Sequence, residues 1–311
     1  MEYRRLGDSD VRVSEICLGT WTTFGGSLSD DAAIALVDAA FELGVNFFDT
    51  ANVYSAGRSE EVLGQALASR PRDSYIVATK VFAPAPDGGR GLSREQILTQ
   101  IDASLERLGM DFVDLYQCHS FDDDVPVEET LGALTEVVDA GKARYIGVSN
   151  WSGEQIRKGV DLAREHGFAK IVSSQPEYSL LERGPEESVI PASRENGVSQ
   201  IVYSPLAQGV LTGKYAPGES AGEGTRAAER SQWMELYNDG VLARVQRLRP
   251  IADGLGCSMA QLALAWILCE PNVASAIIGA SRPEQLRDNA AASGVTLDDA
   301  TLRVIDDALA A

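Results

Sequence analysis

The chain has 311 residues, of which 44% are hydrophobic and 23% charged, a composition typical of a water-soluble protein with a large core. Its 46 acidic and 27 basic residues give a formal net charge of -19, which argues against nucleic acid or an anionic membrane as a partner. No apolar segment of signal-peptide type opens the sequence, and no later run approaches the roughly 18 apolar residues of a membrane span, so we expect a cytoplasmic protein.

Short apolar runs alternate with amphipathic helical patterns after an expected hairpin at residues 2–14. The runs that predict strands lie at 15–19, 45–49, 75–80, 112–118, 144–148, 171–175, 200–204 and 274–278. The helical patterns lie at 30–43, 59–69, 94–108, 127–140, 153–166, 186–196, 241–254, 258–270, 283–291 and about 298–309. Ser93 and Gln96 predict a capping box at the start of helix 94–108.

This alternation implies an α/β fold with parallel strands and right-handed crossovers, which an open doubly wound sheet and a closed barrel both satisfy. Eight units without a linker favour a (β/α)8 TIM barrel, with an N-terminal β-hairpin and extra C-terminal helices. The turn after the first expected strand, LGTWTTFGG, lacks the glycine pattern of a dinucleotide-binding open sheet. We therefore predict a single barrel domain over residues 1–311.

Polar residues gather at the carboxyl ends of the expected strands, where barrels of this type carry their active sites. Asp49, Lys80 and His119 end three successive strands, and Tyr54 lies in the loop after Asp49. The other strand ends carry Thr20, Trp21, Ser149, Asn150, Gln175, Tyr203, Ser204, Ser281 and Arg282. Strand ends meet polar loops in any protein, and that simpler explanation accounts for two or three of these residues but not for the whole pattern.

These four residue types together form a general acid and base suited to a carbonyl–alcohol pair. A tyrosine has a pKa of about 10 in water, and a nearby Lys80 ammonium would lower it. Asp49 would keep Lys80 charged and oriented, and His119 would orient a carbonyl oxygen or share the proton. The set has no evident nucleophile, and with only His119 and His166 in the chain we expect no zinc site.

Some of these residues also have simpler structural interpretations. Lys80 taken alone could be a structural ion-pair partner of Asp49, and Ser149–Asn150 could be the N-cap of helix 153–166. Asp122–Asp124 is expected to be a solvated loop, and His166 a surface residue near a helix C-terminus.

The tryptophans and cysteines are expected to serve mainly as packing residues. Trp21, Trp151 and Trp233 could all pack; Trp21 is the one expected to line a substrate pocket, and Trp266 is assigned to the core. The widely spaced cysteines are expected to be buried and reduced: Cys17, Cys118, Cys257 and Cys269. Strand alternation should turn Cys118 away from His119, which argues against a Cys–His nucleophile pair.

Eight long stretches carry a more specific signal than any single residue. They are RRLG…VSEICLGTW, FFDTANVYSAGRSEEVLG, VATK, the His after DLYQC, GKARYIGVSNW, SQPEYSLL, YSPLAQGVLTGKY and IIGASRPEQLRDNAAA. In this order and spacing they resemble the aldo-keto reductases, particularly the branch with bacterial glyceraldehyde-phosphate-type reductases and the potassium-channel β subunits. The resemblance implies a nicotinamide-dependent carbonyl reductase on a (β/α)8 barrel.

The resemblance also implies roles for the matched residues. Tyr54 would donate the proton, Lys80 and Asp49 would tune it, and His119 would orient the substrate carbonyl. The positions implied to bind the cofactor are Thr20, Trp21, Asp49, Ser149, Asn150, Gln175, Tyr203, Ser204, Pro205, Leu206, Ala207, Gln208, Lys214, Arg226, Gly279, Ser281, Arg282, Gln285 and Asn289. Among these, Tyr203 would stack on the nicotinamide, and 204–208 with Lys214 and Arg226 would lie over the pyrophosphate.

We expect NADP(H) rather than NAD(H) as the coenzyme. Better-known family members have an arginine that binds the 2′-phosphate where this chain has Gln285, and Arg282 or Arg287 would substitute for it. The segment 217–230 is either a mobile lid over the cofactor or disordered.

The expected partner is a small-molecule carbonyl substrate, with no nucleic acid and no membrane, and the sequence does not reveal whether the chain forms an oligomer. Two other functions stay open: an NADPH-binding regulatory subunit of the channel-β type with little turnover, and a sugar-phosphate isomerase or aldolase on the same fold. The channel subunits as a family carry a different residue at the His119 position, so the histidine favours catalysis.

Overall fold

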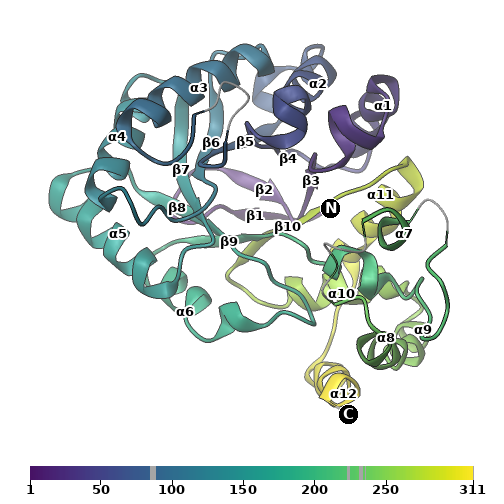
Figure 1. Cartoon of the computed structure of the whole chain (residues 1–311). Coiled ribbons are helices and arrows are strands. Elements are labelled where there is room, and N and C mark those ends of the chain that lie inside the picture. The colour runs from purple at the N-terminus through teal and green to yellow at the C-terminus, as the bar shows by residue number, and fades with distance from the viewer. Residues whose placement is uncertain (85–88, 223–224, 231–233, 235, 311) are drawn as a thin grey trace.

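The computed structural model describes residues 1–84, 89–222, 225–230, 234 and 236–310, with the backbone alone at 229–230. Eight strands form a closed barrel in which every neighbouring pair is parallel, which confirms the predicted (β/α)8 architecture (Figure 1). In chain order they are β3 (Ile16–Gly19), β4 (Phe47–Asp49), β5 (Ile76–Val81), β6 (Val113–Cys118), β7 (Ala143–Ser149), β8 (Ile171–Gln175), β9 (Ser199–Val202) and β10 (Val273–Ile278).

Helices surround the barrel and separate its strands along the chain (Figure 1). They are α1 (Asp30–Glu42), α2 (Arg58–Leu67), α3 (Arg94–Leu108), α4 (Val127–Asp139), α5 (Gly153–His166), α6 (Val189–Glu195), α7 (Arg226–Arg230), α8 (Asp239–Gln246), α9 (Arg249–Leu255), α10 (Met259–Leu268), α11 (Pro283–Ala290) and α12 (Asp299–Ala310). Short helical turns occur at η1 (Thr23–Ser27), η2 (Tyr54–Gly57), η3 (Arg72–Ser74), η4 (Gly184–Glu186), η5 (Ala207–Thr212) and η7 (Ala291–Gly294).

The helix predicted at 241–254 is two helices, α8 and α9, and the one predicted at 186–196 begins at Val189 after the turn η4. Pro250 lies in the first turn of α9, where its missing N–H costs no hydrogen bond, so the chain can start a new helix there but not continue the old one. The other predicted elements agree with the structure to within two residues at each end.

Serine side chains begin several of the helices. Ser152, and not the proposed Ser149–Asn150, caps α5 in a full capping box. At α3 the Ser93 hydroxyl accepts from the Gln96 backbone N–H, but Oε1 of Gln96 has no partner among the described residues, so only half of the predicted box forms.

An antiparallel hairpin of β1 (Tyr3–Arg5) and β2 (Arg12–Ser14) closes the amino-terminal end of the barrel, as predicted. Leu6, Val11 and Val13 are buried against the inward-facing side chains of the strands, such as Phe47 and Leu115. A second, larger apolar core lies around the barrel and includes Trp266. The barrel is therefore filled and sealed at one end, which leaves its carboxyl end for a site.

The cysteines match the prediction only in part. Cys17 and Cys118 are buried and unpaired, whereas Cys257 is half-buried and Cys269 is exposed just after α10.

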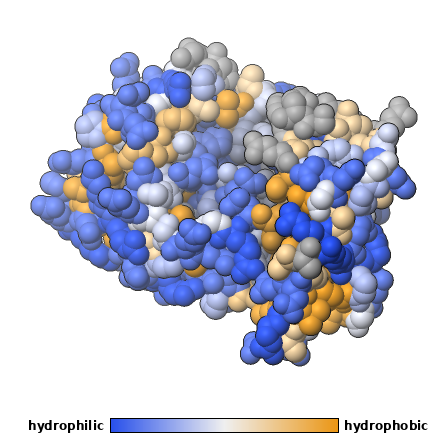
Figure 2. All heavy atoms as spheres, turned by 60° about the horizontal axis from the view of Figure 1, so that its bottom comes forward, coloured by the Kyte–Doolittle hydropathy of each residue, from blue (hydrophilic) through white to orange (hydrophobic). Residues whose placement is uncertain are grey.

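The face of the molecule shown in Figure 2 is predominantly hydrophilic. In the described part of the chain, no single helix is long and apolar enough to cross a membrane; the pair Asp239–Leu255 and Met259–Leu268 passes together but is bent by 87°.

Candidate active site

A cavity of about 870 Å³ opens among the loops at the carboxyl end of the barrel. Its volume lies in the range typical of cofactor and substrate pockets. The predicted residues that line it are Trp21, Asp49, Tyr54, His119, Ser149, Asn150, Gln175, Tyr203, Ser204, Pro205, Leu206, Gln208, Lys214, Arg226, Gly279, Ser281, Arg282, Gln285 and Asn289. Thr20, Lys80 and Ala207 are buried beneath this lining. The barrel thus brings the sequence-distant candidates to one rim.

Lys80 links the carboxylate of Asp49 to the hydroxyl of Tyr54. The Lys80 side chain is fully buried, and its Nζ donates to Asp49 Oδ1 at 2.5 Å and to the Thr50 carbonyl at 2.8 Å. Its third contact is with the Tyr54 hydroxyl, at 3.3 Å. Because an ammonium has three N–H donors, this arrangement satisfies it completely and aims one donor at the phenol.

The pKa of Lys80 agrees with the prediction, and the pKa of Tyr54 does not. Burial lowers the pKa of Lys80, but the Asp49 carboxylate and the Tyr54 hydroxyl together outweigh it and the net pKa is raised, so the ammonium is retained. Burial raises the pKa of Tyr54, and the Lys80 ammonium opposes that shift only in part. The predicted lowering of the tyrosine pKa is therefore wrong, because loss of solvent outweighs the ammonium. A raised pKa keeps the phenol protonated, as a proton donor requires.

His119 lies at the edge of the Tyr54 ring, with ring centroids 5.6 Å apart in a T-shaped arrangement. Burial, with a smaller effect of the Lys80 ammonium, lowers the pKa of His119 to about 3, so the imidazole is neutral at pH 7. Its Nδ1 is buried and has no hydrogen-bond partner within the described chain. The preceding Cys118 packs in the outer core, as strand alternation predicted.

Two amide side chains, from β6 and β8, reach Asp49 inside the barrel. Gln175 Nε2 donates to Asp49 Oδ2 at 3.0 Å, and Gln117 Nε2 lies 3.4 Å from the same oxygen. The sequence analysis missed Gln117. Strand parity could have identified it, because it lies two residues before His119 and therefore shares its inward direction.

Three residues expected to bind the cofactor, Ser149, Asn150 and Tyr203, make hydrogen bonds at the ends of β7, β8 and β9. Asn150 has a left-handed backbone (φ 57°); its Nδ2 donates to the His119 carbonyl at 3.3 Å and its Oδ1 accepts from the Tyr203 hydroxyl at 3.0 Å. Ser149 donates to the Gln175 carbonyl at 2.8 Å. Such a strained backbone in a non-glycine residue is often found at functional sites.

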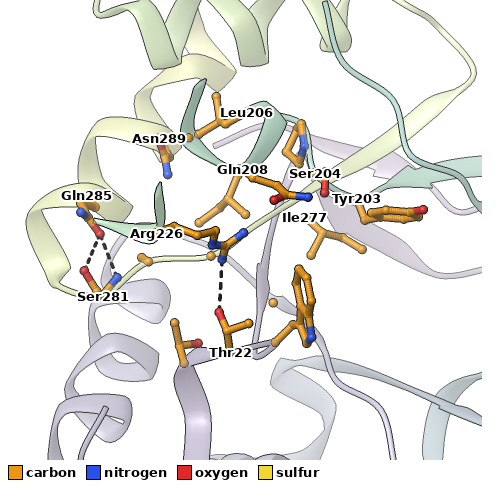
Figure 3. A pocket seen from close by; sticks show the side chains of 18 of the residues that line it. Thr22, Tyr203, Ser204, Leu206, Gln208, Arg226, Ile277, Ser281, Gln285 and Asn289 are labelled. Atoms are coloured by element: carbon orange, nitrogen blue, oxygen red, sulfur yellow. Dashed lines mark hydrogen bonds between the residues drawn. The ribbon is translucent and has the colours of Figure 1, made fainter. Parts of the chain in front are cut away.

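The loop after β9 has the features of an anion-binding segment. Ser204, Ala207 and Gln208 have positive φ angles of 51°, 44° and 56°, a conformation in which successive N–H groups can form a concave anion site. Arg226 faces this loop across the cavity; it donates to Thr22 Oγ1 at 3.2 Å and lies 5.4 Å from the Trp21 ring centroid (Figure 3). Lys214 and Arg282 also line the cavity.

At the far end of the cavity, Gln285 Oε1 accepts hydrogen bonds from the backbone and the hydroxyl of Ser281, at 2.8 and 3.0 Å (Figure 3). Helix α11 begins there, so its N-terminus faces the cavity. Of the two arginines expected to replace the missing one, Arg282 lines the cavity, whereas Arg287 lies outside it, 3.8 Å from Glu42.

Residues on strands, helices and loops that the strand-end pattern did not single out make up the rest of the lining. They are Gly19, Thr22, Thr23, Ser27, Val53, Ser55, Gly209, Thr212, Thr225, Ser258, Ala260, Ile277, Ile278, Ala280 and Asp288. Part of the predicted lid, at 223–224, and Trp233 lie outside the described residues. In the described part of the segment, Thr225 and Arg226 reach the cavity.

Comparisons with known proteins assign this barrel, with these residues at its carboxyl end, to a family. The chain belongs to the aldo/keto reductase family, whose family model matches residues 15–310. It is similar to two proteins named "Probable voltage-gated potassium channel subunit beta", from Oryza sativa subsp. japonica (42% identical) and Arabidopsis thaliana (41%). Each comparison spans 298 residues and covers 93% of this chain and 90% of the relative.

Proposed function

We propose that this protein catalyses the reversible NADP(H)-dependent reduction of aldehydes or ketones to alcohols, with Tyr54 as the general acid. The observation that carries the proposal is the contact of Lys80 Nζ with the Tyr54 hydroxyl, beside His119 and at the wall of a large cavity. Family membership favours this chemistry over an isomerase or aldolase on the same type of barrel.

The residues along the cavity fit a nicotinamide dinucleotide. Lys214, Arg226 and Arg282 line the cavity and supply positive charge for its phosphates. Gln208 Oε1 is buried without a partner among the described residues, which suits a group that bonds to a ligand. A bound nicotinamide coenzyme would supply the hydride that the carbonyl carbon accepts.

The chain's own residues would handle the proton and the developing charge. Tyr54 would protonate the oxygen of the carbonyl, while Lys80 stabilises the phenolate that remains. His119, neutral at pH 7, would donate a hydrogen bond that orients the carbonyl oxygen.

NADP(H) is the proposed coenzyme because the 2′-phosphate adds negative charge that cations at the cavity can bind. Arg282 at the start of α11 is the candidate for that contact. A small-molecule carbonyl as substrate and the cytoplasm as location stay predictions.

Two assays test this function. Fluorescence titration with NADPH and NADH should give saturable binding with the smaller dissociation constant for NADPH. Steady-state loss of absorbance at 340 nm, measured over a panel of aldehydes and ketones that includes 4-nitrobenzaldehyde, should show turnover with NADPH. Binding of neither coenzyme would contradict the proposal.

A second candidate follows from the names of the relatives: a coenzyme-binding β-type subunit with little turnover. It would bind NADPH but reduce no carbonyl in the panel at a useful rate, and the source cell would yield a partner in a pull-down. The histidine at position 119 favours the reductase, because it completes the set around Tyr54.

A further inference from the structure

We infer that Gln117 is a positioning residue for the proposed reaction: together with Gln175 it fixes the carboxylate of Asp49, and thereby the direction in which Lys80 meets Tyr54. This inference rests on the proposed function, and Gln117 itself does not line the cavity. Its role is thus distinct from that of the residues that would touch substrate or coenzyme.

The three side chains close a triangle inside the barrel. Gln117 Nε2 lies 3.4 Å from Asp49 Oδ2, and Gln175 Nε2 donates to that oxygen at 3.0 Å. Gln175 Nε2 also lies 3.4 Å from Gln117 Oε1, which ties the two amides to each other. The other carboxylate oxygen, Oδ1, accepts from Lys80 Nζ. Both oxygens of Asp49 therefore have fixed partners, and the carboxylate cannot rotate without breaking a contact.

The register of the strands builds this arrangement. Gln117 on β6 is the Cα partner of Lys80 on β5 and of Gly147 on β7, so its side chain projects to the same face of the sheet as that of Lys80, into the barrel. Gly147 leaves the space that the glutamine fills: a Cβ there would lie 3.2 Å from Gln117 Cγ and 2.2 Å from Ser173 Oγ. A side chain at 147 would displace its neighbours.

The orientation of the Asp49 carboxylate matters because all three N–H groups of Lys80 already have partners. Lys80 Nζ contacts Asp49 Oδ1, the Thr50 carbonyl and the Tyr54 hydroxyl, which uses all three N–H groups. If Asp49 turns after losing the Gln117 contact, the ammonium follows it and the contact with Tyr54 at 3.3 Å lengthens. Misplacement on the order of 1 Å in a catalytic group can cost about a hundredfold in rate.

The chain offers a matched control. Gln200 on β9 is also a fully buried glutamine, but its Nε2 donates to Asn272 Oδ1 at 3.0 Å instead of reaching Asp49. Replacing it removes a buried amide of the same size without touching the triangle.

The test compares Gln117→Met and Gln117→Glu with Gln200→Met, using kcat for 4-nitrobenzaldehyde and the Kd for NADPH. We expect kcat to fall at least tenfold in Gln117→Met and further in Gln117→Glu, where an oxygen replaces the donor that faces Asp49 Oδ2, while Kd changes by less than about twofold. Gln200→Met should keep both values within about twofold. Equal kcat in the Gln117 and Gln200 variants, or a loss confined to coenzyme binding, would overturn the inference.

A second readout needs no turnover and so separates this inference from the proposed function. The chain has five lysines, so side-chain ¹⁵N NMR can resolve the Lys80 ammonium, and Lys80→Met assigns its signal. We expect that signal to shift or broaden in both Gln117 variants and to stay in place in Gln200→Met. An unmoved Lys80 signal in all three variants refutes the positioning role, whatever the protein reduces.

Discussion

The two ends of this barrel each bury a carboxylate, but they surround it with different partners. At the amino-terminal end, Asp114 accepts from Arg72 at 2.7 Å, from the Val77 backbone N–H at 2.9 Å and from Arg144 at 3.2 Å. At the carboxyl end, the Lys80 ammonium that pairs with Asp49 also contacts Tyr54 at the cavity. The partners of Asp114 stabilise the fold. The partner of Asp49, Lys80, also contacts Tyr54, a side chain that a substrate in the cavity can reach.

The other residues at the two ends of the barrel also differ in character. The hairpin seals the amino-terminal end with apolar side chains such as Leu6 and Val13. The rim instead holds non-glycine residues with positive φ angles, such as Asn150 and Gln208, and polar atoms that lack a protein partner in the described chain. Backbone strain of this kind costs stability, so its concentration at one end marks that end as the functional one.

The largest expected effect is that of removing the Tyr54 hydroxyl. Tyr54→Phe should lower kcat by about a thousandfold or more, since general acid catalysis contributes about 10²–10⁴ and the ring contacts remain. Stopped-flow loss of NADPH absorbance measures the rate, and the Kd for NADPH serves as the control. Turnover equal to that of the unaltered protein would remove Tyr54 from the mechanism.

Exchanging one cation at each end tests the comparison itself. Lys80→Met should lower kcat by about a hundredfold or more, because the phenolate loses the charge that stabilises it. Arg72→Met should leave kcat nearly unchanged and lower the free energy of unfolding by about 2 kcal/mol, since Asp114 keeps its other partners. Urea unfolding and steady-state assays on both variants decide this. Similar loss of activity in both would erase the distinction between the two ends.

Low pH should cost stability through His119. Its pKa is about 3 in the folded protein, below the ordinary value near 6.5. Between these two pH values the unfolded chain therefore binds the proton more readily than the folded protein does. The stability that this difference contributes is complete above pH 6.5 and is lost as the pH falls toward 3, by up to about 1.4 kcal/mol per unit. Urea unfolding at pH 7, 6 and 5 should show a steeper loss in the unaltered protein than in His119→Asn. Parallel slopes would contradict the lowered pKa.

The smallest expected effect concerns the choice of coenzyme. Arg282→Met should raise the Kd for NADPH about tenfold, close to 1.4 kcal/mol, and the Kd for NADH less, because the proposed contact of its guanidinium with the 2′-phosphate is lost. Fluorescence titrations with both coenzymes measure the two constants. An equal change for NADPH and NADH would place Arg282 at a phosphate that both coenzymes share.

Much of the fold was predictable because strand and helix patterns are local. The bounds of α3 and α5 follow from apolar periodicity and terminal glycines, Gly109 and Gly167. The break between α8 and α9 was missed, although Pro250 signals it, because the apolar pattern continues through the proline. Exposure of Cys269 was missed as well, since an apolar stretch does not show which residue turns outward at its end.

The candidate site was predictable to the extent that strand ends must converge in a barrel. This rule identified Asp49, Lys80 and His119, but it does not fix how deep each side chain lies, and Lys80 is buried behind the cavity lining. The direction of the Tyr54 pKa depends on a balance between burial and charge that only coordinates reveal. Residues away from the strand ends, such as Asp288 on α11, also reach the cavity, and the strand-end pattern does not identify them.

The most direct test of the central claim follows the hydride itself. Incubation of the protein with 4-nitrobenzaldehyde and NADPH that carries deuterium at both C4 positions of the nicotinamide should give alcohol with one transferred deuterium by mass spectrometry, and Tyr54→Phe should give almost none in the same time. Alcohol without deuterium, or no alcohol from any carbonyl under conditions where NADPH binds, would contradict the account of this rim as a reductase site.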